Sequence, residues 1–334
     1  MMALIDSFGR KLDYLRVSVT DKCNLRCAYC MPPEGVKLLP HDEVLRNEEF
    51  IHLLGLFVQL GVVKLRFTGG EPLVRKGFID IVRRTKELYP RVEMGLTTNG
   101  ILLDEVMEDL HRIGMRKLNV SLDTLSRDRY RAISGQDSFD RVLRNIEAAL
   151  RHACFEVKIN TVLFDASSLA ELDGLLEYFK DKKATLRFIE RMPFGARQDG
   201  SFIPSENLVQ MLHARGALRR DTRSDTNVAV MYTLIYKNRH PMRIGVIPSM
   251  THKFCNRCNR LRLTCDGKLK TCLLSPMEFD LKGPYRMDMG DETLRSLILE
   301  AARQKPREHQ LSCEDPGDGC TALCSSGAMS RIGG

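Results

Sequence analysis

Short apolar segments alternate with amphipathic segments from Tyr14 to about Arg191. Six apolar segments have the length and residue types of β-strands: residues 14–20, 62–68, 92–98, 117–122, 155–163 and 184–190. Five amphipathic segments predict helices, the first with Asn47 as a possible N-cap: residues 47–60, 77–89, 104–113, 139–152 and 168–179. Strands that alternate with helices predict an α/β fold with a parallel sheet and helices outside it.

Five of the six strands have one polar and one apolar face. Side chains alternate between the faces of a strand, so Arg16 and Ser18 share one face of the first strand and Leu15 and Val17 share the other. A parallel sheet covered by helices on both sides would instead have nearly continuous apolar strands. We therefore expect a partial (βα)6 TIM-type barrel whose polar, often cationic, lumen holds a ligand; a solvated edge would explain only one or two such strands.

The pattern changes after about Met192. A helix is expected at residues 205–215, strands at 228–236 and 242–247, and a further helix near 292–303. The segment from Ser312 is rich in Gly, Ser and Cys and has no periodicity, which predicts irregular structure. We expect residues 1–225 to form the partial barrel and residues 226–334 to form a C-terminal region that closes its lumen.

Charge and cysteine content narrow the functional classes. The net charge of +8 is typical either of a basic surface or of a protein with an anionic ligand. No segment is apolar for long enough to span a bilayer, and the first ten residues lack the apolar core of a signal peptide, so we expect a cytoplasmic protein. Eleven cysteines in that compartment indicate metal binding rather than disulfides.

Three cysteines follow the first strand with the spacing C-x3-C-x2-C: Cys23, Cys27 and Cys30. Three thiolates on one loop can hold three irons of a 4Fe–4S cluster, which leaves the fourth iron open to a small molecule. A structural zinc ion is the alternative, but zinc needs four ligands, and the nearest histidine is the distant His41.

A second group consists of Cys255, Cys258 and Cys272, the last beyond a turn at Asp266 and Gly267. These residues could form a zinc ribbon with Cys265 as the fourth ligand, or a second 4Fe–4S cluster with an open iron. Cys154 has apolar neighbours in the sequence and is expected to be a buried structural cysteine.

The first motif, with an aromatic residue before its last cysteine, resembles the signature of the radical S-adenosylmethionine (SAM) superfamily. The sequence Thr-Gly-Gly-Glu-Pro at 68–72 resembles the SAM-binding element of that superfamily. The second motif, together with residues 64–72 and the terminal Gly-Gly, is similar to the GTP 3′,8-cyclase family over nearly the whole chain. This resemblance implies two 4Fe–4S clusters and SAM as cofactors. It implies SAM contacts at Tyr29, Gly70, Ser121 and Met192.

The same resemblance implies GTP as the substrate. GTP carries about four negative charges, which would compensate a cluster of buried cations. The implied GTP-binding residues are Arg16, Lys64, Arg66, Thr97, Lys158, Arg260, Leu261 and Arg262, with Lys64 inferred mainly from its strand face. Arg187, inferred in the same way, is a candidate for the later proton or electron steps, and the Gly333-Gly334 tail is implied to reach into the active site.

The implied reaction is the radical cyclisation of GTP to (8S)-3′,8-cyclo-7,8-dihydroguanosine 5′-triphosphate, the first step of molybdenum cofactor biosynthesis. The implied partners are an electron donor and a cyclic pyranopterin monophosphate synthase that takes the product. Neither nucleic acid nor membrane is expected as a partner, and the chain is expected to be a monomer or homodimer.

Two features depart from the family pattern. Cys265 stands where a small non-ligand residue is usual, and the tail carries three cysteines that the pattern does not require, Cys313, Cys320 and Cys324. One alternative is another two-cluster radical SAM enzyme, such as one that modifies peptides. A zinc-dependent nucleic-acid-binding protein is the other alternative, disfavoured by an aromatic content of 7% and the absence of tryptophan.

Overall fold

The computed structural model describes residues 3–31, 35–163, 165–192, 202–222, 228–237, 239–309 and 329–333. Over these residues a single curved sheet runs in the order β12-β11-β10-β1-β2-β3-β4-β5-β6-β9-β8-β7. Its first six strands are β1 (Tyr14–Ser18), β2 (Lys64–Thr68), β3 (Glu93–Thr98), β4 (Lys117–Ser121), β5 (Glu156–Leu163) and β6 (Ala184–Glu190). They are parallel and adjacent in chain order, which confirms the predicted α/β class.

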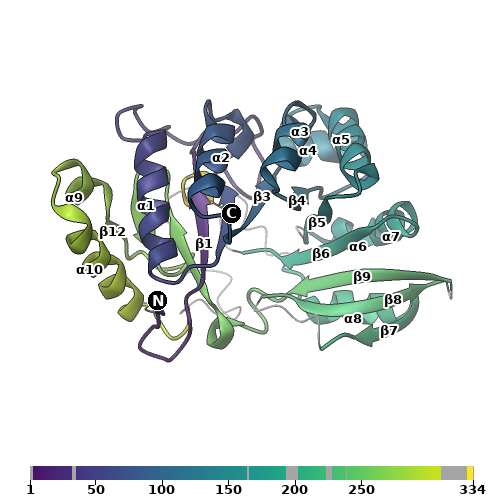
Figure 1. Ribbon diagram of the computed structural model, residues 1–334. Coiled ribbons are helices and arrows are strands. Elements are labelled where there is room, and N and C mark those ends of the chain that lie inside the picture. Colours follow the sequence, from purple (N-terminus) through teal and green to yellow (C-terminus); the bar gives the residue numbers. More distant parts are fainter. Residues whose placement is uncertain are drawn as a thin grey trace.

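The helices between these strands cover one side of the sheet (Figure 1). They are α1 (Asn47–Gln59), α2 (Phe78–Leu88), α3 (Met107–Ile113), α4 (Arg127–Ser134), α5 (Phe139–Arg151), α6 (Ala166–Ala170) and α7 (Leu172–Phe179), with the 3-10 turns η1 (Pro72–Val74) and η2 (Leu103–Glu105). The apolar strand faces meet this layer. Leu15 and Phe67 of the sheet and Phe50 and Phe57 of α1 are fully buried in one core cluster.

The structure corrects three details of the helix prediction. Helix α1 has Arg46 at its N-cap, so Asn47 is its first residue and its side-chain oxygen instead accepts a hydrogen bond from Arg75. The segment 168–179 contains two helices, α6 and α7, rather than one. Helix α4 was not predicted, because its charged sequence buries only Tyr130, Ile133 and Ser134 and gives almost no apolar stripe.

The C-terminal part of the chain extends the sheet at both edges. Strand β10 (Arg260–Leu263) pairs in parallel with β1, and β9 (His240–Ile247) pairs in parallel with β6. Beyond them lie β11 (Lys268–Lys270) and β12 (Phe279–Asp280) on one side, and β8 (Val230–Tyr236) and β7 (Gly216–Arg220) on the other. Strands β7 and β8 lie on opposite sides of the predicted boundary in sequence and pair with each other, and the boundary itself stays a prediction.

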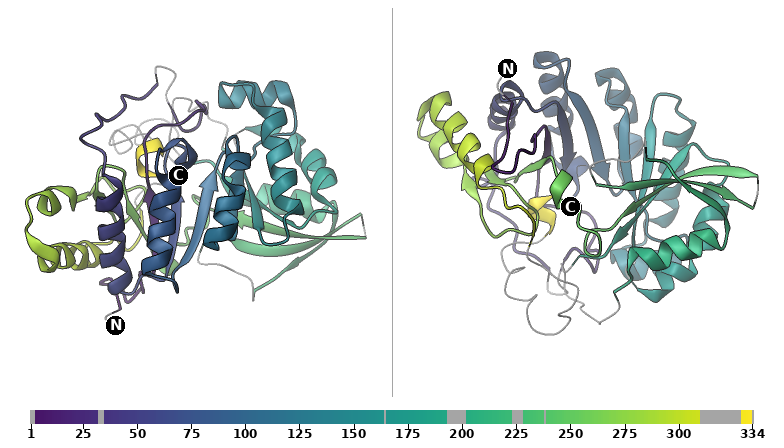
Figure 2. Two further views of the ribbon diagram at one scale, coloured as in Figure 1. Left: turned by 45° about the horizontal axis from the view of Figure 1, so that its top comes forward. Right: turned by 90° about the horizontal axis from the view of Figure 1, so that it is seen from below.

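The remaining helices are α8 (Ser205–His213), α9 (Lys282–Arg286), α10 (Gly290–Arg303) and α11 (Met329–Ile332), with the turn η3 (Cys255–Arg257). Viewed from below, α11 lies on the inner side of the curved sheet, and it contacts β1 (Figure 2). The prediction of irregular structure from Ser312 is therefore wrong for Met329–Ile332. No helix in the described ranges is long and apolar enough to cross a membrane.

Candidate active site

The first cysteine loop follows β1 at the carboxyl ends of the parallel strands. The sulfur-bearing residues Cys23, Cys27 and Cys30 line one cavity there. Helix α4 holds the loop in place, because Arg26 N donates to Ser134 O at 2.8 Å and Ala28 N donates to Ile133 O at 3.0 Å. The helix that the hydrophobic pattern missed is thus the support of the three cysteines.

The Gly-Gly-Glu-Pro segment packs directly on the cysteine loop. Gly70 N donates to Thr20 O and Glu71 N donates to Lys22 O, both at 2.8 Å. A Cβ atom on Gly70 would lie 2.3 Å from Lys22 O, so only glycine permits this approach. The buried Glu71 carboxylate accepts hydrogen bonds from Thr98 Oγ1 and Asn99 N, each at 2.7 Å, and burial raises its pKa to about 7.

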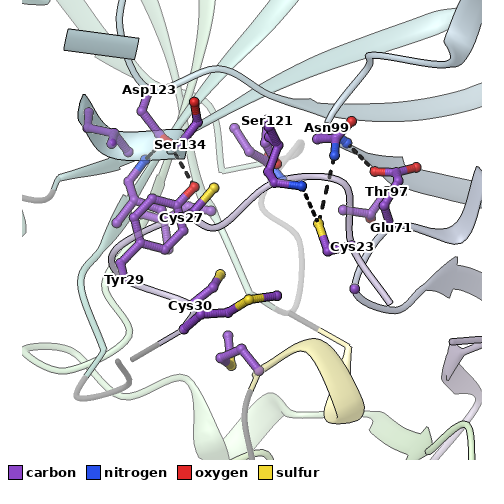
Figure 3. A pocket seen from close by; sticks show the side chains of 18 of the residues that line it. Cys23, Cys27, Tyr29, Cys30, Glu71, Thr97, Asn99, Ser121, Asp123 and Ser134 are labelled. Carbon is purple, nitrogen blue, oxygen red and sulfur yellow. Dashed lines mark hydrogen bonds between the residues drawn. The ribbon is translucent and has the colours of Figure 1, made fainter. Parts of the chain in front are cut away.

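All four residues predicted to contact SAM line this same cavity: Tyr29, Gly70, Ser121 and Met192. Figure 3 shows the Tyr29 hydroxyl directed at Asp123, to which it donates at 2.7 Å, and Asn99 directed at Cys23. The hydrogen bond to Asp123 fixes the ring beside the cysteine loop. Thr97, predicted to bind GTP, lines this first cavity rather than the cationic one beside it.

The first cavity suits an iron–sulfur cluster. Burial raises the pKa of Cys23 to about 11 and that of Cys30 to about 12, so a thiolate here needs a bound positive charge. Iron ions supply that charge, and three thiolates suit a 4Fe–4S cluster with an open iron. Asn99 Nδ2 reaches Cys23 Sγ at 3.9 Å and can orient this sulfur.

A second cavity opens on the polar faces of the strands. Seven of its lining residues are the cations Arg16, Lys64, Arg66, Lys158, Arg187, Arg260 and Arg262. Burial lowers the pKa of Arg187 to about 10, and repulsion from Arg66 and Arg16 adds to this effect. Burial and repulsion from Arg16 and Arg260 likewise lower the pKa of Arg262 well below its usual value.

Few acidic groups neutralise these cations. Lys64 pairs with Glu93 at 3.0 Å and Lys158 with Glu156 at 2.6 Å. Other buried atoms of the cavity have no hydrogen-bond partner among the described residues: Arg66 Nε, Asn119 Oδ1, Asn160 Oδ1 and Asn259 Oδ1. Since unmatched buried polar atoms and like charges are costly, this cavity is built for a ligand that is both polyanionic and rich in hydrogen-bonding groups.

Six of the eight residues predicted to bind GTP line the cationic cavity, and Thr97 and Leu261 do not. Leu261 pairs in register with Leu15, and its fully buried side chain belongs to the core under the helices. The neighbouring Arg260 and Arg262 point to the opposite face, into the cavity. Any contact of Leu261 with a ligand would therefore have to come from its backbone.

The second cysteine group lines a third cavity. Cys255 and Cys258 lie in and after η3, Cys272 follows β11, and Arg260 and Arg262 share the cavity with them. Cys265 does not line it. Its buried side chain instead lies near Asp21 and Asp266, and burial raises its pKa. The three-thiolate interpretation is therefore favoured over a zinc ribbon that uses Cys265.

Lys305 is a site residue that sequence reasoning missed. Its buried Nζ donates to Arg260 O at 3.0 Å and to Thr271 O, and so joins the two segments that carry the cysteines. Burial alone would raise the pKa of the Cys258 thiol, but attraction to Arg260 and Lys305 overrides it and lowers that pKa to about 6. A thiolate is thus stabilised here, as a metal ligand requires. Nothing in the local sequence marks Lys305, which lies after α10.

The segment with α11 and Gly333 reaches Arg262 at the wall of the cationic cavity. Arg262 Nη1 donates to Gly333 O, and a Cβ atom on Gly333 would lie 2.4 Å from Thr68 Cγ2. Gly333 also has a φ of 79°, which favours glycine. Arg331 secures α11 through Asp266 at 2.7 Å and Glu278 at 3.0 Å. Gly334, Cys313, Cys320 and Cys324 lie outside the described residues.

The three cavities adjoin one another on the inner, concave face of the curved sheet. Met192 lines all three, and Asn160 and Ile189 are shared by the first two. A polyanion in the middle cavity would have a three-cysteine group on either side. The arrangement can therefore bring a substrate between two iron–sulfur clusters, one of which has room beside it for a second small molecule.

This fold and the first cavity define a radical SAM enzyme, and the family description "Radical SAM superfamily" matches residues 17–179. A second description, "Molybdenum Cofactor Synthesis C", matches residues 184–311. Among curated proteins, a GTP 3′,8-cyclase of Peptoclostridium acidaminophilum is 39% identical over 92% of this chain and 94% of its own length. The chain belongs to the GTP 3′,8-cyclase family, and its cofactors are SAM and two 4Fe–4S clusters.

Other relatives agree with this assignment. A GTP 3′,8-cyclase of Desulforamulus reducens is 38% identical over 92% of the chain and 95% of its own length. A "Molybdenum cofactor biosynthesis protein 1" of Dictyostelium discoideum is also 38% identical over 92% of the chain, which spans 49% of that longer protein. Streptococcus suis SuiB has a similar fold, with a TM-score of 0.58 and 13% identity over 80% of this chain and 62% of its own.

Proposed function

We propose that this chain converts GTP to (8S)-3′,8-cyclo-7,8-dihydroguanosine 5′-triphosphate. One observation carries the proposal: a cavity lined by seven cations lies between two groups of three cysteines. A triphosphate compensates the cations, and a purine and a ribose offer partners to the unmatched amide oxygens. The relatives named above as GTP 3′,8-cyclases support this substrate.

The protein groups mainly bind and orient the substrate. Arg16, Lys64 and Arg66 would hold the phosphates by charge-assisted hydrogen bonds. The guanine would then lie toward the second cysteine group, near Arg260, and the ribose toward the first cavity. Cys23, Cys27 and Cys30 would hold the first cluster, and SAM bound beside it would supply the radical chemistry that begins the reaction at the ribose.

The later steps require protons and a dry cavity. Arg187 lies in the middle cavity, and its lowered pKa of about 10 makes it a better proton donor than an ordinary guanidinium. The bond from Arg262 to Gly333 O keeps the chain terminus against the cavity wall, where it helps to exclude water. Arg187 and the Gly333-Gly334 tail are thus the groups we propose to act during cyclisation.

Several partners follow from this function. The product would pass to a cyclic pyranopterin monophosphate synthase, and an electron donor would reduce the clusters. A peptide-modifying radical SAM enzyme is the alternative function. The middle cavity disfavours it, because seven cations, three of them buried, suit a compact polyanion better than a peptide.

The decisive experiment is an anaerobic assay of the cluster-loaded protein with a strong reductant, SAM and GTP. We expect 5′-deoxyadenosine together with a GTP-derived product that oxidises to a fluorescent pterin. The variant Arg66→Ala should lose the pterin, whereas Arg219→Ala, at an exposed arginine of β7, should retain it. Formation of 5′-deoxyadenosine without a pterin would remove GTP as the substrate and leave the radical SAM class intact.

A further inference from the structure

Two histidines and a cysteine converge outside the three cavities. His111 lies in the last turn of α3, His152 is the C-cap of α5, and Cys154 lies in the turn that leads into β5. Their ligand atoms all lie within 4.8 Å of one another. Helices α3 and α5 are neighbours in the outer layer (Figure 1), so the cluster joins the ends of two helices and one strand entry.

The contacts are centred on the sulfur. Cys154 Sγ lies 3.2 Å from His111 Nδ1 and 3.0 Å from His152 Nδ1. Cys154 packs against the apolar core as expected, but it is half-buried rather than buried, and it lies between two imidazoles that the sequence did not indicate. One thiol hydrogen can serve only one nitrogen, so the two imidazoles must take different roles if no metal is bound.

The electrostatic surroundings favour a cation. The C-terminal ends of α3 and α5 both lie here, and helix C-termini carry partial negative charge. The nearest arginines in sequence are paired, Arg112 with Glu108 at 3.3 Å and Arg151 with Glu147 at 4.0 Å. The rings of His111 and His152 lie 4.9 Å apart at a tilt, and Phe155 supports His152 at 4.8 Å.

We propose that His111, His152 and Cys154 form a binding site for a zinc ion, separate from the two cluster sites. Two imidazole nitrogens and one thiolate are ligands that Zn²⁺ prefers, and water can complete the tetrahedron. Ligand atoms in such a tetrahedron lie roughly 3.5 Å apart. The observed 3.0 Å and 3.2 Å need only small side-chain rotations to reach that spacing.

The bound ion would be a structural cross-link in the helical layer outside the sheet. It would join α3, α5 and the segment that leads into β5. Without the ion, these three elements meet here through the side chains of His111, His152 and Cys154. None of the three ligands lines the cavities of the active site. We therefore expect zinc binding to affect stability and to leave the chemistry of the reaction unchanged.

The test uses the full protein with both clusters loaded. Zinc is added anaerobically, excess zinc is removed, and zinc and iron are measured per chain. X-ray absorption at the zinc edge then reports only the zinc site, because iron is invisible there. We expect one zinc ion per chain, with one sulfur at about 2.3 Å and two nitrogens at about 2.0–2.1 Å.

Variants give the control. Cys154→Ser and His152→Gln should each lose the bound zinc at unchanged iron content, which also shows that they fold. His213→Gln, at an exposed histidine that ends α8, should keep it. Two outcomes would overturn the proposal: a wild-type protein that retains no zinc, as expected of a thiol that is merely hydrogen-bonded, or full zinc retention in Cys154→Ser.

Discussion

At the scale of single residues, the active site is dominated by an excess of positive charge. The cations of the middle cavity repel one another in the absence of an anion, and burial makes each charge more costly. Tyr14 lies among them, with Lys64 Nζ 4.9 Å from its ring. Burial opposes its phenolate, but the charges of Arg66, Arg16 and Lys64 outweigh burial and lower the pKa of Tyr14 to about 7.

This tyrosine should make GTP binding depend on pH. A bound triphosphate competes with the phenolate for the same cations, so binding raises the pKa of Tyr14 and takes up a proton at pH above about 7. The GTP affinity should therefore fall as the pH rises from 7 to 9, by at most about tenfold per pH unit for one proton. Tyr14→Phe should show a shallower fall, measurable by titration calorimetry on cluster-loaded protein. Identical pH profiles for the two proteins would contradict the assignment.

Replacing one cavity arginine should separate stability from function. Arg187→Met removes a half-buried cation that Arg66 and Arg16 repel, so the ligand-free protein should gain about 1–2 kcal/mol in free energy of unfolding. The same variant should lose most of the turnover. Thermal unfolding and product formation measure the two effects. Arg219→Met, at the exposed arginine of β7, should change neither, and a destabilised Arg187→Met would argue against mutual repulsion.

At the scale of elements, short segments that bury little surface set the geometry of the site. Helix α4 supports the first cysteine loop through backbone bonds. The carboxylate of Glu190 joins the end of β6 to the start of α8 and to the segment after β9, since it accepts from Ser205 N at 2.7 Å and from Met250 N at 2.8 Å. Helix α11 is secured by Arg331 and brings Gly333 to Arg262.

The terminal segment is predicted to be needed for cyclisation and dispensable for cluster assembly. Deleting Gly333 and Gly334 should abolish pterin formation, because the contact of Arg262 with Gly333 O is lost, and a C-terminal tag should do the same by adding bulk beside this contact. Iron content should stay at the wild-type level, since neither residue is a thiolate ligand. Parallel iron analysis and product assays measure this difference. A truncated protein with wild-type turnover would end the proposed role of the tail.

At the scale of the whole molecule, one sheet holds both cysteine groups. The C-terminal strand β10 pairs with β1, so Arg262 lies directly beside Arg16 although the two are far apart in sequence. At the other edge β9 pairs with β6 beside Arg187. The pairing of distant strands therefore places the two cysteine groups on either side of the cationic cavity.

The contributions of the two cysteine groups to iron binding and to the reaction should be separable by mutation. Cys272→Ser should lower the iron content to roughly half, because one of two 4Fe–4S clusters loses a ligand. Formation of 5′-deoxyadenosine should persist, since the first cavity is unchanged, while pterin formation is lost. Cys265→Ser is the matched control and should retain all of the iron, because Cys265 lies outside the cavity. Equal iron loss in both variants would place Cys265 among the ligands.

The sequence by itself determined the local features. The alternation of side chains along each strand is a local property, so it correctly placed Arg16, Arg66 and Arg187 on one face and predicted all six parallel strands. The cysteine spacing likewise identified the first group of three, because Cys23, Cys27 and Cys30 lie on one short loop, whereas it left Cys265 open as a member of the second group. The resemblance of these motifs then led to the family that the comparisons confirm.

Only the tertiary structure decided which distant segments meet. It separated Cys265 from the second cysteine group, turned Leu261 into the core and brought Lys305 between the cysteine segments. It also placed His111 beside Cys154, for which no sequence pattern exists. These contacts depend on how strands pair and how helices pack across the whole chain, and such long-range choices are made by burial of the common core rather than by any short stretch of residues.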